Sequence, residues 1–318
     1  MDYVYTNGTI AVKEQRLLGE KIYRMCEMAA EDAFRYLTES GFGAGAEAGS
    51  MYEVERLIQA DERELDAFIR DFAPSKVEKA YFLAPRDFHN AKAIVKAEAL
   101  VKDAGDMLAP EGLFPVEKIL SCVREEKYDL LGKELGRAVK ESAEFLKENA
   151  DGAKVGMIFE RALYEYLLVS CRRNKLLKKL ITGRIDRINL LTAFRAQSIE
   201  DAEKNLIEGG TVPSKIFKKI FSDGDGAERA LANGELSAFS AACFAAKREG
   251  APFTAAEKML ASYEGEFFKA HKFDLDKNLP FLYYVLRRRA EEENVRIVFV
   301  CLLAGMKEGE IKARLRTV

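Results

Sequence analysis

The stretch that decides the fold is residues 87–94, which read DFHNAKAI. The pattern returns as DRINLLTA at residues 186–193 and, more weakly, as EEENVRIV at residues 291–298. Each copy has an acidic residue, two other residues and then an asparagine that precedes apolar positions. These asparagines are Asn90, Asn189 and Asn294, with separations of 99 and 105 residues. A fixed period of this kind indicates an architecture built from similar units.

A second mark repeats with nearly the same period. Residues 112–115 read GLFP and residues 210–213 read GTVP, 98 residues further on. Each mark is predicted to open a helix, because proline is tolerated at a helix start. Two marks that agree on the period predict three helical domains of about 100 residues, a usual domain size. Their predicted boundaries are 1–108, 109–209 and 210–318.

Helical spacing dominates the rest of the chain and predicts an all-α fold. Apolar pairs recur along residues 158–182, which predicts one long amphipathic helix that is broken at Gly183. Pro85 is expected to interrupt a helix, whereas Pro74-Ser75 is expected to precede one that starts at Lys76. Each repeat asparagine is expected to open an apolar helix.

Composition excludes several classes of protein. Hydrophobic residues make up 48% of the 318 residues, enough for a large core, and the formal net charge is only −2. A balanced charge gives no general attraction to nucleic acid, so no nucleic-acid partner is expected. No window holds the roughly 18 apolar residues of a membrane span. The polar start and five scattered cysteines predict a cytoplasmic protein with reduced thiols.

The sequence predicts no catalytic, cofactor-binding or metal-ligating residue. His89 and His271 lack the acids, nucleophiles or further ligands that hydrolases and metal sites place around a histidine. The glycines at residues 41–45 lack the preceding strand and the Gly-Lys-Ser/Thr ending of a phosphate loop. A loop without a nucleotide is therefore expected there.

The polar repeat residues have two interpretations. Aspartate and asparagine cap helices well, since their side-chain oxygens accept from free backbone N–H groups. Alternatively, they line a rim or seam between the units. The residues concerned are Asp87, Asn90, Asp186, Asn189, Glu291 and Asn294.

Two basic clusters, at residues 172–179 and 287–289, are expected to be solvated helix faces, or else contact patches for acidic protein loops.

Together these marks resemble a known family: the C-type subunits of archaeal and bacterial V/A-type ATPases, which are the equivalents of the d-type subunits of the eukaryotic vacuolar enzyme. The resemblance spans the whole chain, from Arg16-Leu17-Leu18, through the three repeat marks, to the ending at residues 305–315. It departs from the family in a start that is poor in arginine, and in Val300, which stands where the earlier copies have Lys96 and Arg195.

The resemblance implies three similar helical domains around a pseudo-threefold axis, which form a funnel. It implies a non-catalytic rotor linker that docks central shaft subunits of the D and F type onto the membrane proteolipid ring. Torque would pass through it for ATP-coupled H+ or Na+ transport. It also implies a single copy per complex, a monomer when isolated, and peripheral attachment to the membrane through the complex.

Two other functions fit the same physical features. A helical-repeat scaffold of an unrelated assembly would also show a repeat and no active site. A helical enzyme would need a titratable cluster or a bound cofactor in a pocket, and the sequence indicates neither.

Overall fold

The computed structural model describes residues 3–149, 151–271 and 279–316. Across these ranges the regular elements are α-helices and short 3-10 turns, with no strand, which confirms the prediction of an all-α fold. The chain divides into two compact units. The terminal unit contains residues 1–78 and 262–318, and the central unit contains residues 79–261. The two boundaries fall inside helices α5 and α14.

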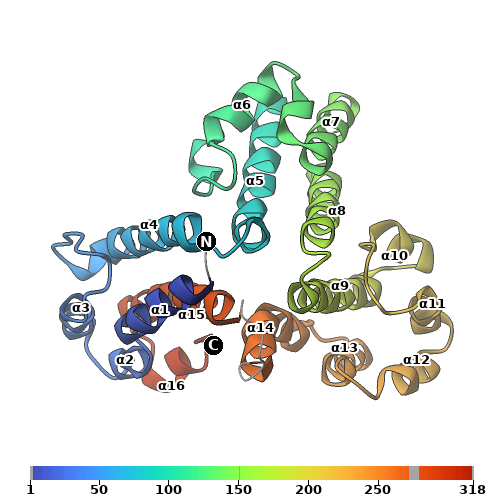
Figure 1. The fold of residues 1–318 in the computed structure, drawn as a ribbon. Helices are drawn as coiled ribbons and strands as arrows, with labels where there is room; N and C mark the ends of the chain where they lie inside the picture. The colour runs from blue at the N-terminus through green and yellow to red at the C-terminus, as the bar shows by residue number, and fades with distance from the viewer. Residues whose placement is uncertain (1–2, 150, 272–278, 317–318) are drawn as a thin grey trace. The chain divides into compact units, whose positions relative to one another are not determined.

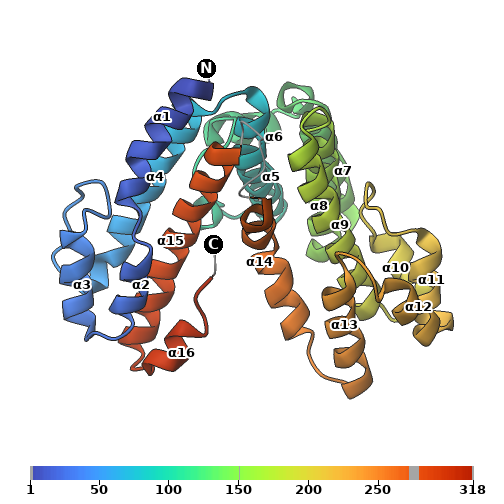
Figure 2. The same cartoon turned by 60° about the horizontal axis from the view of Figure 1, so that its bottom comes forward.

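The terminal unit combines helices from both ends of the chain. Its long helices are α4 (Val54–Phe72) and α15 (Leu279–Leu303), and α1 (Tyr3–Lys13) runs beside them (Figures 1 and 2). Its shorter helices are α2 (Glu20–Met25), α3 (Ala30–Glu39) and α16 (Glu308–Lys312).

One apolar core holds this unit together. Leu37 on α3, Ile58 on α4 and Phe299 on α15 are fully buried in one cluster. Nearer the start of α15, Phe68 stacks on Phe281 with 5.8 Å between the ring centroids. Full burial of one such side chain contributes about 1.5–3 kcal/mol. The packing therefore joins α15 firmly to helices from the other end of the sequence.

The central unit is a succession of helices in chain order. Its first half contains α5 (Lys76–Ala99), α6 (Val116–Arg124), α7 (Lys133–Glu148) and α8 (Gly152–Ser170). Its second half contains α9 (Lys175–Arg195), α10 (Ile199–Asn205), α11 (Ser214–Ser222), α12 (Gly224–Leu231), α13 (Ser237–Glu249) and the beginning of α14 (Thr254–His271).

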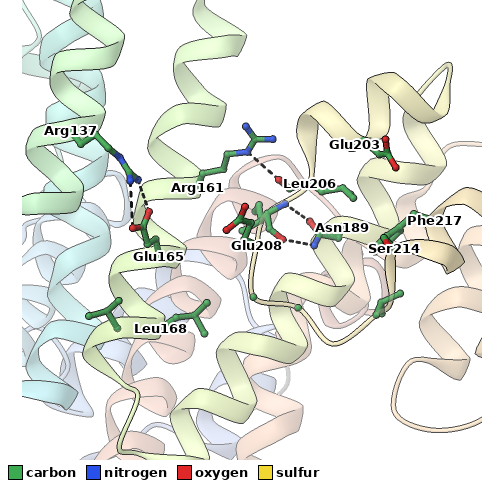
Figure 3. Close-up of a pocket in the computed structure, with 15 residues that line it drawn as sticks. Arg137, Arg161, Glu165, Leu168, Asn189, Glu203, Leu206, Glu208, Ser214 and Phe217 are labelled. Carbon is green, nitrogen blue, oxygen red and sulfur yellow. Dashed lines mark hydrogen bonds and ion pairs between the residues drawn. The ribbon is translucent and has the colours of Figure 1, made fainter.

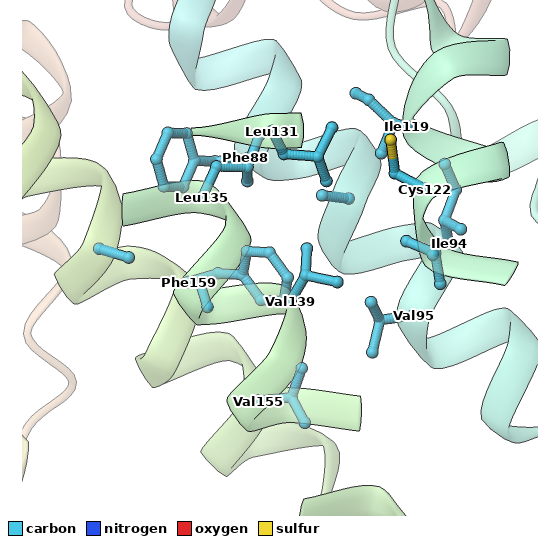
Figure 4. Packing of buried hydrophobic residues seen from close by; sticks show 14 of the residues in the cluster. Phe88, Ile94, Val95, Ile119, Cys122, Leu131, Leu135, Val139, Val155 and Phe159 are labelled. Carbon is cyan, nitrogen blue, oxygen red and sulfur yellow. The ribbon is translucent and has the colours of Figure 1, made fainter. Parts of the chain in front are cut away.

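Each half of the central unit has its own core. In the first half, Ile94 from α5, Ile119 from α6, Val139 from α7 and Phe159 from α8 pack together (Figure 4). In the second half, a cluster that includes Phe194 contains residues of α9 to α14. Each core is built by one long helix and the shorter helices after it. The domain boundaries after residues 108 and 209 remain predictions.

The single helix predicted over residues 158–182 is wrong. Helix α8 ends at Ser170 and α9 begins at Lys175, while Gly183 lies inside α9. Asn174 causes the break, because its side chain accepts a hydrogen bond from the backbone N–H of Leu177 and so caps the new helix. The apolar spacing continues across the break, which is why periodicity alone did not reveal it.

Two further expectations about helix ends are wrong. Pro85 lies inside α5, where the helix continues past it despite the missing N–H group. The repeat asparagines do not open helices either: Asn90, Asn189 and Asn294 lie 14 or 15 positions after the first residues of α5, α9 and α15. The expected starts at Lys76 and directly after the two Gly-x-x-Pro marks are confirmed.

Candidate functional site

The first repeat copy forms a clamp on a distant segment. Asp87 accepts hydrogen bonds from the backbone N–H groups of Leu113 and Phe114, with lengths of 2.9 and 3.1 Å. One turn further along α5, the Asn90 amide both accepts from Ala109 N (2.8 Å) and donates to Ala109 O (3.1 Å). We call this pair the first clamp. It fixes the segment that leads into α6.

The second copy repeats this geometry on α9. Asp186 accepts from the backbone N–H groups of Thr211 and Val212 at 2.6 and 3.0 Å. The Asn189 amide pairs with both backbone groups of Ile207 at 2.7 and 2.8 Å. This second clamp fixes the segment that leads into α11. The equivalence of the two copies therefore extends from sequence to hydrogen bonding.

The third clamp uses both ends of the chain. Glu291 on α15 accepts from the backbone N–H groups of Leu18 and Gly19 at 3.0 and 2.8 Å, just before α2 begins. Asn294 pairs with both backbone groups of Arg316 at 2.8 and 2.9 Å. The segments that follow the long helix in the other two copies are here replaced by the segment between α1 and α2 and by the segment after α16.

The length of the acidic side chain in each clamp fits the space beside the backbone segment that it binds. A Cβ added at Gly112 or at Gly210 would collide with the carboxylate of Asp87 or Asp186, so glycine permits the close approach. In the third clamp Leu17 precedes the bound N–H groups and the acid is Glu291, whose side chain is one methylene longer. The longer side chain of Glu291 leaves room for the side chain of Leu17 on the bound segment.

All six clamp residues are buried, with at most 7% of their surface exposed. Buried backbone groups need partners, and the clamps supply them to segments that have no helix or strand of their own. Hydrogen bonds to an ionised group contribute about 1.5–3 kcal/mol each. Burial raises the pKa of Glu291, although the N–H groups of Gly19 and Leu18 favour its ionised form. The residues do bind free N–H groups, as the capping interpretation required, but in distant segments and not in their own helices.

Sequence reasoning missed a buried ionic network between α4 and α15. Arg288 is 7% exposed and pairs with Asp61 at 2.7 Å and with Glu64 at 3.4 Å, and it donates to the Tyr284 hydroxyl. Burial acts to lower the pKa of Arg288, but the Asp61 carboxylate outweighs it and the pKa is raised. The expectation that residues 287–289 form a solvated face or contact patch is therefore wrong for Arg288. The only signal in the sequence was an arginine four positions after a tyrosine.

Glu292 lies at the centre of this network, between Arg288 and Arg296 on the same face of α15. It is 4% exposed, and its Oε1 atom has no partner among the described residues. Burial, followed by the neighbouring charges of Asp61 and Glu62, raises the pKa of Glu292 to about 9. These surroundings favour the protonated form of Glu292. Arg296, paired with Glu55 at 2.7 Å, closes the network at its other end.

A cleft of about 740 Å³ lies in the central unit beside the second clamp (Figure 3). Arg137 and Glu165 form an ion pair on one wall, and Arg161 donates to the backbone carbonyl of Leu206 at 3.1 Å. Asn189 of the clamp also lines it. Both arginines therefore already have acceptors, and two further acidic residues, Glu203 and Glu208, also line the cleft.

The histidines have structural contacts. A ring nitrogen of His89 lies 2.9 Å from the Met107 carbonyl oxygen, and His271 stacks on Phe267. Within the described ranges no three His, Cys, Asp or Glu side chains gather as a metal site would require. None of the helices described is long and apolar enough to cross a bilayer. All five cysteines are buried and free.

A family model described as ATP synthase (C/AC39) subunit matches residues 6–314. The chain belongs to the ATP synthase (C/AC39) subunit family. A comparison with curated proteins gives no match. As a C/AC39 subunit, the chain is an accessory component of a V/A-type ATPase. This membership overrules the alternative of a scaffold in an unrelated assembly, and all three clamps lie within the matched residues apart from Arg316.

Proposed function

We propose that this C/AC39 subunit is the rotor linker of its V/A-type ATPase. It docks central shaft subunits of the D and F type onto the membrane proteolipid ring and transmits torque for ATP-coupled H+ or Na+ transport. It performs no catalysis itself, is present once per complex, is a monomer when isolated, and is held at the cytoplasmic face of the membrane through the complex. The family match over residues 6–314 carries the proposal.

The clamps support this proposal through stiffness. A part that transmits torque must deform little between the surface that receives the force and the surface that delivers it. Buried charge-assisted hydrogen bonds fix the loops after α5 and α9, and the third clamp fixes both chain ends against α15. The segments that would otherwise yield first under load are thereby tied to long helices. The three domains at 1–108, 109–209 and 210–318, around a pseudo-threefold axis, belong to the same proposal.

A cross-linking experiment tests the rotor assignment directly. The five native cysteines are buried, so a cysteine introduced at the exposed Val12 on α1 reacts selectively with a maleimide photocross-linker. In the assembled ATPase, cross-linking to a shaft subunit should leave ATP hydrolysis and ion pumping intact, because the two parts turn together. Cross-linking to a ring subunit should be equally harmless.

The matched control is the same cysteine in complexes treated with linker but not illuminated. Loss of turnover on cross-linking to a shaft or ring subunit would place this chain outside the rotor. Failure to capture either subunit from several exposed positions would contradict the proposed contacts.

Membranes that lack the chain should keep ATP hydrolysis by the head while losing ATP-driven pumping, and the added chain should restore pumping.

A further inference from the structure

The joint between α8 and α9 is unusually basic (Figure 1). Residues 166–185 contain six arginines and lysines and no acidic residue, in a chain where acidic residues slightly outnumber basic ones. Five of these cations are exposed. Four of the five form what we call the basic tip: Arg172, Arg173, Lys175 and Lys178. The apolar residues between them, Leu176 and Leu177, are buried, so the cations cover the outer face of the joint.

The basic tip has no acidic partner among the described residues. Cations beside it do have partners: Lys179 pairs with Glu235 at 2.9 Å, and Arg184 donates to the Tyr164 hydroxyl at 3.0 Å. No ion pair and no side-chain hydrogen bond of the four tip residues occurs within the described ranges. Four like charges therefore repel one another at the joint without local compensation.

Helix stability does not explain these lysines. Lys175 and Lys178 lie in the first turn of α9, which contains no acidic residue, and a cation at this end opposes the helix dipole. The Asn174 side chain already accepts a hydrogen bond from the backbone N–H of Leu177 at this end of the helix. Folding alone would favour acidic residues at these positions. The stability of α9 alone therefore does not account for these lysines.

The other repeat copies have only part of this feature. By the spacing of the repeat asparagines, each position of the basic tip corresponds to a position 99 residues earlier in the first copy and to a position 105 residues later in the third copy. In the sequence, two of these four positions are basic in the first copy and one is basic in the third: Lys76, Lys79 and Lys277. The two lysines of the tip therefore recur in the first copy, whereas neither arginine has a basic counterpart there. The combination of all four cations occurs in the second copy alone.

We propose that the basic tip binds an anionic membrane surface through lipid headgroups. Val169 lines the cleft in the central unit, whereas none of the four tip residues does. Lys175 and Lys178 lie on α9, and Arg172 and Arg173 lie in the turn before it. Clusters of four or more Lys and Arg on or beside a helix are typical of binding to anionic lipids, where each contributes independently of detailed geometry. Val169, 51% exposed beside the tip, adds an apolar contact at such an interface. This contact goes beyond docking on the proteolipid ring.

The test measures vesicle binding by the purified full-length chain in a flotation assay. Vesicles of phosphatidylcholine alone are compared with vesicles that contain about one third phosphatidylglycerol. Binding should require the anionic lipid and should fall steeply as salt rises from about 0.05 to 0.5 M. The double variant Lys175→Gln/Lys178→Gln should bind about 25-fold more weakly, at about fivefold for each lysine.

The matched control is Lys215→Gln/Lys219→Gln on α11, which removes the same charge from two exposed lysines of the same unit. It should bind within about twofold of the unchanged chain. Equal losses in both double variants, equal binding to neutral vesicles, or no binding to anionic vesicles would each overturn the proposal. Because the isolated chain is used, these outcomes do not depend on the rotor assignment, which the cross-linking experiment decides separately.

Discussion

Replacing Glu292 with glutamine should stabilise the terminal unit in a pH-dependent manner. The carboxyl group of Glu292 is buried next to Asp61 and Glu62, and its pKa is raised to about 9. An amide has nearly the same shape, can donate a hydrogen bond to Asp61, and never ionises. The change therefore removes the titratable carboxyl group and leaves the packing between α4 and α15 almost unaltered.

The magnitude follows from linkage. In the unfolded chain the pKa of Glu292 is near the ordinary value of 4.5, whereas burial in the folded protein raises this pKa to about 9. A raised folded pKa means that stability is fully present below the unfolded pKa and falls as pH rises towards the folded pKa. Each pH unit in this window costs the unchanged protein about 1.4 kcal/mol. The Glu292→Gln variant should gain that amount per unit, or roughly 3 kcal/mol between pH 5 and pH 7.

Helical circular dichroism during thermal unfolding is a suitable assay, because the chain contains no tryptophan. The two units need not unfold together, so hydrogen exchange of peptides from α4 and α15 should be measured alongside circular dichroism. The control Glu144→Gln removes one charge from the exposed face of α7. Parallel stability profiles for the unchanged protein and Glu292→Gln between pH 5 and pH 9 would show that Glu292 is ionised in the folded protein and refute the reasoning.

Three further substitutions test the clamps and the ionic network. Asn189→Ala should lower the free energy of unfolding by about 2–4 kcal/mol, because it leaves both backbone groups of Ile207 unpaired. Hydrogen exchange at residues 206–213 should become faster, and unchanged exchange there would argue against a clamp. Gly210→Ala should accelerate exchange in the same segment, because the added Cβ meets the second clamp's carboxylate. Arg288→Met should lower the stability of the terminal unit by about 3–5 kcal/mol, since Asp61 stays buried without its cation; a smaller loss in chemical denaturation would indicate that water reaches Asp61.

Much of the local structure was predictable because its causes are local. The helix starts at Lys76 and after the two Gly-x-x-Pro marks follow from proline and glycine chemistry. Buried Leu176, Leu177, Leu180 and Ile181, with lysines between them, follow from the period of a helix. The break at Asn174 was missed, because a cap interrupts a helix without interrupting its apolar spacing.

The clamp residues could be located but their contacts could not. An acid and an asparagine three positions apart are compatible with capping, with a seam or with exposure. Their partners lie 18 to 27 residues away in the first two clamps and at both chain ends in the third. The buried Arg288 gave even less warning, because its partners Asp61 and Glu64 come from a helix more than 200 residues earlier.

The sequence by itself determined the all-α class, the period of the repeat and the family, since these depend on residue types and spacing along the chain. The tertiary structure decided which backbone segments the acidic residues bind. Asp87 and Asp186 bind the segments that lead into α6 and α11, whereas Glu291 binds the segment that leads into α2, near the start of the sequence. The physical reason is that a side chain's partner is chosen by proximity after folding. Burial then makes that pairing obligatory, because an unpaired polar group inside the protein costs more than the hydrogen bond contributes.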